Sequence, residues 1–271
     1  MTGLQRLIKC AAIVFAVFLS VSIIGGILGV AGLVGGFFAV NTVSEEMTTY
    51  PVTADVRNLS ICVGAADLYI KEGDVFSVQS NLEHLKVEQE GDELIIEETR
   101  EFGVTVNGAV LTIYVPADAV FENVSITTGA GRLTVEQLTS GTLDFELGAG
   151  DVSIISLIAT KAAEIDGGAG RITIADGSVQ NLNLSMGVGQ LNLTSALTGV
   201  CQLDLGIGQS DITLLGAKDD YKLEIEKGVG TVIVDGETVT NHESSGTGAN
   251  NVELNGGIGT VSVRFIEAED E

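Results

Sequence analysis

The feature that most constrains the fold is a glycine motif that returns at nearly constant spacing. The triplet Gly-x-Gly recurs from residue 129 onward, flanked each time by alternating apolar residues, with first glycines at Gly129, Gly148, Gly168, Gly187, Gly206, Gly228 and Gly257. The steps between them are 19, 20, 19, 19, 22 and 29 residues. A fixed period of this length is typical of repeat architectures, in which each copy stacks on its neighbour.

The residues on either side of each triplet alternate between apolar and polar. Aligning the copies on the triplet gives four apolar columns, five and three residues before it and two and four residues after it. The column three residues before the triplet holds Ile126, Phe145, Ile165, Leu184, Leu203, Ile225 and Leu254. At the fifth triplet we expect the apolar residues Ile212 and Leu214 to arrive two residues late. Alternation is the period of a strand with one buried face.

These patterns predict an all-β protein built as a parallel β-solenoid. Each repeat is a strand, a Gly-x-Gly corner, a second strand and a turn. Seven coils at about 4.8 Å per interval give a stack of roughly 30 Å. Leu59 to Ile70 match the same template, with Gly64-Ala65-Ala66 at the corner. Between this unit and Gly129 we expect a β-meander that packs beside or caps the stack, and at the other end we expect the acidic residues 267–271 to blunt the exposed edge.

The N-terminal segment predicts a membrane anchor. No charged residue occurs between Lys9 and Glu45, and the intervening stretch is rich in Ile, Val, Leu, Phe and Gly. It exceeds the roughly 20 residues that cross a bilayer and is longer than the apolar core of a signal peptide, which favours a retained anchor over the alternative of a cleaved signal. Arg6 and Lys9 precede it, so the N-terminus is expected in the cytoplasm and the rest outside. The expected organisation is 1–9 cytoplasmic tail, 10–40 transmembrane anchor, 41–57 linker, 58–128 first repeat unit with meander, 129–266 solenoid repeats and 267–271 acidic tail.

The net charge of the chain and the spacing of glycines in the predicted anchor indicate which partners the protein can have. The chain carries 13 Lys and Arg against 37 Asp and Glu, a net charge of −24. This excess of acid argues against nucleic acid, whose phosphates require a basic surface. Within the anchor, Gly25, Gly29, Gly32 and Gly36 have the four-residue spacing that lets helices approach closely. A homo-oligomer through these glycines is one interpretation, and the general abundance of glycine in membrane helices is the other.

No catalytic, cofactor or metal motif emerges. The glycines that open calcium-binding repeats are followed here by Ile172 and Val261 instead of aspartate. Each Gly-x-Gly leads into a strand, so no dinucleotide loop forms. We expect His84 and His242 to be solvated side chains. Cys201 falls on the inward parity and Cys62 on the outward parity, which disfavours a disulfide between them. We therefore expect no enzyme, no cofactor and no metal site, with a carbohydrate-active β-helix as a weak alternative.

The outward columns before the corner are the candidate site. They hold eight carboxylates: Asp144, Glu146, Glu164, Asp166, Asp204, Glu224, Glu226 and Glu253. The columns after the corner are rich in hydroxyls, with Arg132, Asp151 and Arg171 in alternating sign. Stacked like charges are unfavourable. The acidic face is either a solvated surface that prevents aggregation or a face that attracts divalent cations or a cationic protein or peptide.

The coils "TTGAGRLTV" and "LGAGDVSI", the unit Leu59 to Ile70 and the strand ending Val110 to Pro116 resemble the bacterial putative-adhesin family of β-strand repeat proteins, long described as a domain of unknown function. The resemblance covers roughly residues 55–265. It implies a β-solenoid tethered by one N-terminal membrane helix, and it supplies no catalytic residues. We therefore expect an adhesin-like surface or interaction module. The alternative is an accessory or sensor component of an envelope-stress response.

Overall fold

The structure is a computed structural model that describes residues 46–53, 55–98, 108–239 and 243–267. In these ranges the chain is all β apart from one 3-10 turn, η1 (Lys218–Asp220). No helix among them has the length and apolar character needed to span a bilayer. The predicted anchor, 10–40, lies outside the described residues together with Gly25, Gly29, Gly32 and Gly36.

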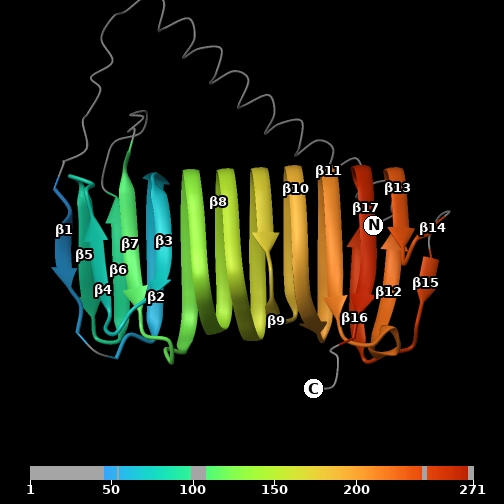
Figure 1. Cartoon of the computed structure of the whole chain (residues 1–271), viewed down its shortest axis with the longest axis horizontal. Coiled ribbons are helices and arrows are strands. Elements are labelled where there is room, and N and C mark those ends of the chain that lie inside the picture. The colour runs from blue at the N-terminus through green and yellow to red at the C-terminus, as the bar shows by residue number, and fades with distance from the viewer. Residues whose placement is uncertain (1–45, 54, 99–107, 240–242, 268–271) are drawn as a thin grey trace, which may run out of the picture. The chain divides into compact units, whose positions relative to one another are not determined.

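The predicted coils form a parallel ladder. β8 (Phe121–Ile174) runs through three Gly-x-Gly corners, and β10 (Leu182–Thr198) and β11 (Val200–Leu215) through one each. β10 pairs in parallel with β8 on one side and β11 on the other, so that Leu184 lies between Ile165 and Leu203. We call the strands before the corners the pre-corner sheet and those after them the post-corner sheet. Figure 1 shows the coils as a row of parallel ribbons.

The apolar columns lie inside the coils, which confirms the core prediction. Both columns before the corner are at most 4 % exposed along their whole length. After the corner they are also buried, apart from Val234, which is half-buried. The predicted delay at the fifth triplet is wrong. Ile212 pairs with Leu193 and keeps its column, while the buried Ser210 pairs with Leu191 and takes the inward position. The inward column tolerates one serine, so the register does not shift.

The segment expected as a turn in each repeat is a short third side with its own core residues. β9 (Gly177–Gln180) pairs in parallel with Leu157 to Ala159 of β8 and with Ala196 to Thr198 of β10. Val179 faces Ala159 and Leu197 across these pairings, and all three are buried. These three coils are therefore closed by backbone pairing and apolar burial on this side as well.

At the N-terminal end, the stacking order differs from the chain order. The predicted repeat unit is confirmed as β2 (Asn58–Ala65) and β3 (Asp67–Glu72), which pair in parallel with the first coil of β8. The expected meander is only partly correct. β6 (Glu93–Glu98) and β7 (Val110–Val115) pair in parallel with β2 and β3, and so form a further coil on their outer side.

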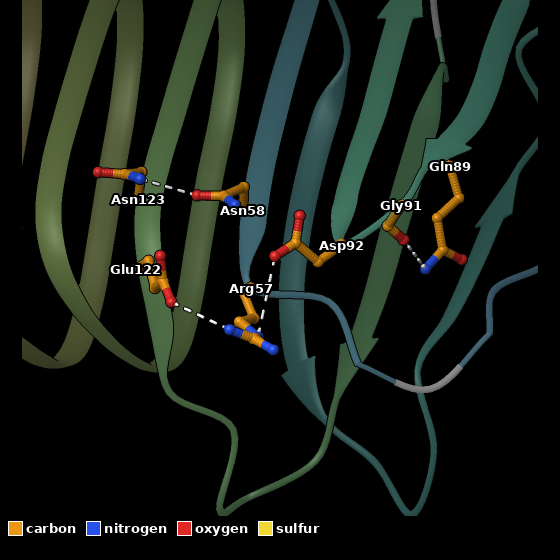
Figure 2. Close-up of polar contacts among 7 residues, drawn as sticks. All are labelled: Arg57, Asn58, Gln89, Gly91, Asp92, Glu122 and Asn123. Carbon is orange, nitrogen blue, oxygen red and sulfur yellow. Dashed lines mark hydrogen bonds and ion pairs between the residues drawn. The ribbon is translucent and has the colours of Figure 1, made fainter.

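Polar contacts mark the position of β2 between two neighbours. Figure 2 shows Arg57 reaching Asp92, at the turn before β6, and Glu122, near the start of β8. The N–O distances are 3.8 and 3.4 Å, and all three side chains are well exposed. Such pairs contribute little stability in water. The inward columns therefore hold β2 in place, and the Nδ2 of Asn123 donates an additional 2.8 Å hydrogen bond to the side-chain oxygen Oδ1 of Asn58.

The C-terminal end repeats this exchange of order. The last coil of the chain, β16 (Asn250–Asn255) and β17 (Ile258–Ile266), lies between β11 and the preceding coil, β12 (Tyr221–Glu226) and β13 (Val229–Val234). Figure 1 shows β17 between β11 and β13. At both ends, the coil nearest the chain terminus is therefore paired on both edges. The acidic tail follows the interior strand β17, and residues 268–271 lie outside the described residues, so its predicted role at the end of the stack stays a prediction.

Short antiparallel strands cover the two end coils of the stack. At the N-terminal end, β5 (Leu85–Glu90) pairs with β6, β4 (Ser77–Ser80) with β7, and β1 (Thr48–Pro51) with β4. The segment 41–57, expected as a linker, thus includes β1. At the other end, β15 (Glu243–Ser245) pairs with β12 and β14 (Glu237–Val239) with β13. Short or charged edge strands discourage pairing with other chains.

The described residues make nine coils, counted by their pre-corner strands β6, β2, three in β8, β10, β11, β16 and β12. Eight intervals of about 4.8 Å give a stack of about 38 Å. Glycine permits the tight corners. A Cβ on Gly148 would lie 2.1 Å from the Gly129 carbonyl oxygen, and a Cβ on Gly150 would lie 1.8 Å from that of Gly131. Gly150 also has φ +150°, which side chains rarely adopt.

Candidate functional site

The outward columns of the pre-corner sheet carry all eight predicted carboxylates. Successive strand residues point to opposite faces, so positions two and four residues before the triplet face away from the core. The inward neighbours of these residues are buried, and the carboxylates themselves are exposed or half-buried. The outward parity predicted from the sequence is confirmed at each position. The structure divides the eight residues into two groups.

Acidic cluster 1 consists of Asp144, Glu146, Glu164 and Asp166. Gly168 stacks on Gly148, since a Cβ on Gly168 would lie 2.2 Å from the Gly148 carbonyl oxygen. This register places Asp144 beside Glu164 and Glu146 beside Asp166 on adjacent strands, about 5 Å apart. Ser185 on the next coil donates a hydrogen bond to Asp166. Four carboxylates thus form a two-by-two block, an arrangement that costs folding free energy through like-charge repulsion.

Acidic cluster 2 consists of Asp204, Glu224, Glu226 and Glu253. The exchanged coil order decides its arrangement, because Glu253 of β16 pairs with Gln202 on one side and Glu224 on the other. Asn255 lies between Asp204 and Glu226 and donates a 2.7 Å hydrogen bond to Asp204.

Other donors moderate the charge of acidic cluster 2. Lys222 pairs with Glu224, and Gln202 donates to Asp204 at 2.9 Å. Lysine and amide donors therefore offset part of the repulsion in this cluster.

A neutral coil separates the two clusters. β10 presents the neutral Asn183 and Ser185. Asn183 pairs with Glu164 on one side and Gln202 on the other, and Ser185 pairs with Asp166 and Asp204. The N-terminal coils present Ser60 and Ser125 in the same column. The expected single acidic face is therefore two acidic clusters separated by a neutral coil, and Glu97 of β6 is a further outward acid at the N-terminal end of the sheet.

The post-corner sheet carries the predicted ladder of alternating charge. Arg171 lies 3.7 Å from Asp151 on one neighbouring coil, and its Nε donates a 3.0 Å hydrogen bond to Gln190 on the other. Arg132 lies 3.9 Å from Asp67, the first residue of β3. Opposite charges that face each other on adjacent strands stabilise the pairing modestly. This sheet therefore has locally balanced charge, in contrast to the pre-corner sheet.

A row of apolar side chains on the corner edge was not predicted from the sequence. The middle residue of each triplet points outward, and Val188, Ile207, Ile258 and Val229 lie on successive coils in that order. All four are exposed. The signal was present in the sequence as the change from alanine to valine and isoleucine at the middle position of the triplet. The reordering of the last two coils could not be read from it.

Other candidate groups lie as the parity predicts. Cys62 is exposed and Cys201 buried, and both are free thiols. Burial raises the pKa of the Cys201 thiol, which keeps it in its unreactive neutral form. His84 is exposed, whereas His242 lies outside the described residues. Across the described part of the chain, no three His, Cys, Asp or Glu side chains are grouped so as to hold a metal ion.

Residues 56–246 match the family model Toastrack DUF4097, which covers most of the coils described above. The chain belongs to this family. The Toastrack match ends before β16 and β17, the coil that is inserted between β11 and β13. No curated protein matches the chain.

Several solved structures resemble the chain at low sequence identity. A putative adhesin from Bacteroides fragilis is 16 % identical, with a TM-score of 0.50 over 83 % of this chain and 99 % of that one. A putative cell adhesion protein from Clostridium sporogenes is also 16 % identical, with a TM-score of 0.39 over 82 % and 99 %. A putative adhesin from Parabacteroides distasonis is 17 % identical, with a TM-score of 0.42 over 83 % and 99 %. The family resemblance inferred from the sequence is confirmed, and membrane anchoring stays a prediction.

Proposed function

We propose that this Toastrack protein is a non-catalytic, membrane-anchored interaction module, adhesin-like in role. In this proposal the N-terminal helix holds the chain in the cell membrane with the solenoid on the outer side. The solenoid binds cationic partners through acidic clusters 1 and 2. The observation that carries the proposal is the two-by-two block of carboxylates in acidic cluster 1, which a nine-coil stack holds on a fixed lattice.

The interior and the surface of the solenoid support this proposal in different ways. Cavities beneath the glycine corners measure about 20 Å³, which is room for little more than one water molecule. The flat pre-corner sheet instead offers carboxylates at strand spacing, and grouped charges of one sign raise the association rate of an oppositely charged partner. The neutral β10 coil shows that a coil folds without acids at these positions.

Anchoring is tested by fractionation of the full chain. We expect the protein to stay in the membrane pellet after an alkaline carbonate wash, because an apolar helix of this length does not leave the bilayer. A chain beginning at Glu46 should appear in the supernatant. External protease should cleave the solenoid of intact cells from which any outer wall or membrane has been removed. Release of the full chain by carbonate would contradict the anchor.

Binding through acidic cluster 1 is tested by calorimetric titration of the full chain in nanodiscs with decalysine and, separately, with calcium. We expect decalysine to bind and to weaken steeply as salt is raised, because screening acts on exposed charges. The variant Asp144→Asn, Glu146→Gln, Glu164→Gln, Asp166→Asn should bind at least tenfold more weakly. Each substitution keeps side-chain size and removes one charge.

The control removes the same number of charges elsewhere. Asp74, Glu83, Asp118 and Asp219 are exposed and lie outside the two acidic clusters. Their conversion to the corresponding amides removes the same number of negative charges, so a general charge effect would weaken binding by both variants alike. Equal binding by the cluster variant and the parent chain would exclude acidic cluster 1 as the binding surface. Calcium binding by the parent chain, without any binding of decalysine, would reassign the cluster to a metal-cation site.

A further inference from the structure

The exposed apolar row on the corner edge is defined here as the corner ridge: Val188, Ile207, Ile258 and Val229. Backbone pairing places each residue beside the next, in the order Val188, Ile207, Ile258, Val229. Their side chains are 40, 41, 53 and 71 % exposed. Three intervals of about 4.8 Å make the ridge about 14 Å long. Glycines flank every ridge residue, so no neighbouring side chain on the corner covers it.

The fold does not require this ridge. The same corner position on the preceding coils holds Ala130, Ala149 and Ala169, which are exposed within the same backbone geometry. Val188 pairs directly with Ala169, so the change from alanine to larger aliphatics occurs between adjacent coils. A β-branched residue favours extended backbone, but threonine would supply that preference without exposing an apolar side chain. Contiguous apolar side chains on a soluble surface mark interaction sites.

Charge on either side of the ridge is asymmetric. On the pre-corner side, Asp204 and Glu226 lie three residues before Ile207 and Val229 along the chain, a distance of about 10 Å in extended backbone. Acidic cluster 2 therefore runs parallel to the ridge. On the post-corner side, the first outward residues are the neutral Gln190, Gln209, Thr260 and Thr231. Lys222 and Lys227 are the lysines nearby, against the four carboxylates of the cluster.

These dimensions suit one class of occupant. An α-helix is about 10–12 Å wide and has a pitch of 5.4 Å, close to the coil spacing. A helix lying along the stack can therefore place apolar side chains on the ridge at every turn and basic side chains over acidic cluster 2. A second copy of this chain is disfavoured, because it would bring two acidic clusters together and the four ridge residues alone bury far less than a stable dimer needs. Anionic lipid is disfavoured for the same reason of charge.

We propose that the corner ridge and acidic cluster 2 together form a docking surface for a cationic amphipathic segment of a partner protein. The segment lies along the stack with its apolar side on Val188, Ile207, Ile258 and Val229. Its lysine or arginine side chains face Asp204, Glu226 and Glu253. This inference rests on the proposed function and adds to it the location and the mixed apolar and basic character of the partner. Charge brings the partner in, and the ridge fixes its position and direction.

The test compares two synthetic peptides on the full chain in phosphatidylcholine nanodiscs, after subtraction of binding to empty discs. One peptide, of about 14 residues, has leucine and lysine at helical spacing. The other has serine in place of leucine and the same charge. We expect the leucine peptide to bind about tenfold more tightly, because apolar anchors at the centre of an interface carry most of the affinity. The double variant Ile207→Ser, Ile258→Ser should remove this difference and leave the serine peptide unaffected.

The matched control is Ile155→Ser, Val200→Ser, which removes two aliphatics that are 56 and 66 % exposed and lie outside the ridge. It should keep the tenfold difference. Equal affinity of the two peptides, or a difference that survives Ile207→Ser, Ile258→Ser, would overturn the docking surface while leaving charge-based binding intact. Failure of both peptides to bind would overturn the proposed function as well. Ridge-dependent dimerisation in sedimentation, without peptide, would overturn the proposal in favour of a second copy.

Discussion

Leu184→Asp is expected to prevent the solenoid from folding. Leu184 is 0 % exposed and lies between Ile165 and Leu203 in the middle of the stack. Truncating a buried leucine costs about 2–5 kcal/mol. An unpaired carboxylate in that position adds an effective penalty of several kcal/mol. Together these terms approach or exceed the roughly 5–15 kcal/mol by which domains are stable.

Denaturant unfolding followed by circular dichroism, together with limited proteolysis, measures this effect. We expect loss of the strand signal and cleavage within the central coils. Leu184→Met, which conserves volume, should cost less than about 1.5 kcal/mol. Asn183→Asp introduces the same charge one residue earlier on the outward face, beside Glu164. It should cost less than about 1 kcal/mol. A stably folded Leu184→Asp protein would show that the inward columns do not carry the fold.

The inner structure of each coil was predictable because it depends on local alternation. The polar neighbours Asn183 and Ser185 indicate that Leu184 points inward, and the triplet marks where the strand turns. The same parity placed all eight carboxylates outward. It also assigned Cys201 to the core and Cys62 to the surface. These properties need only the sequence of one repeat and its alignment with the next.

The order of the coils was not predictable because it depends on which edges meet. Leu254 presents the same apolar pattern to Leu203 and to Ile225, and it pairs with both. The spacing of 29 residues before Gly257 signalled an insertion, but a long connection can return the chain to either side of a coil. The need to cover exposed strand edges decides the order. When the last coil lies between two others, the coil at the end of the stack is the one covered by short antiparallel strands. The composition of acidic cluster 2 and the corner ridge follows from that choice.

The short third side of the coil was missed for a different reason. Its inward residues, such as Val179 and Leu197, fall in segments that differ in length between coils. Val179 pairs with both Ala159 and Leu197, but the number of residues between the paired positions differs in the two cases. An alignment on the glycine triplet loses register at this distance. Glycines of the triplet keep the alignment at the other corners because a Cβ there would contact the backbone of the neighbouring coil, whereas the corner between β2 and β3 has Ala66 in place of the second glycine. This explains why the triplet is the most reliable feature in the sequence.

Gly189→Ala is the sharpest test of that explanation. Gly189 has φ +146°, and a Cβ built on it would lie 1.7 Å from the Gly170 carbonyl oxygen of the coil beneath. Positive φ costs a residue with a side chain about 1–2 kcal/mol. Forcing the two coils apart adds a term comparable to overpacking a core, about 1–3 kcal/mol. We therefore expect a loss of about 2–5 kcal/mol in the free energy of unfolding.

Three other substitutions separate the two causes. Gly236 has φ +83° and nothing within 4 Å of its Cβ position, so Gly236→Ala reports the cost of the backbone conformation alone. A Cβ on Gly148 would lie 2.1 Å from the Gly129 oxygen, and its φ lies outside the positive range, so Gly148→Ala reports the steric contact alone. Val188→Ala changes the exposed residue beside Gly189 and should leave stability unchanged within about 0.5 kcal/mol. If Gly189→Ala cost no more than Gly236→Ala, close stacking of the corners would not be what requires glycine, because the steric contact would then contribute nothing measurable.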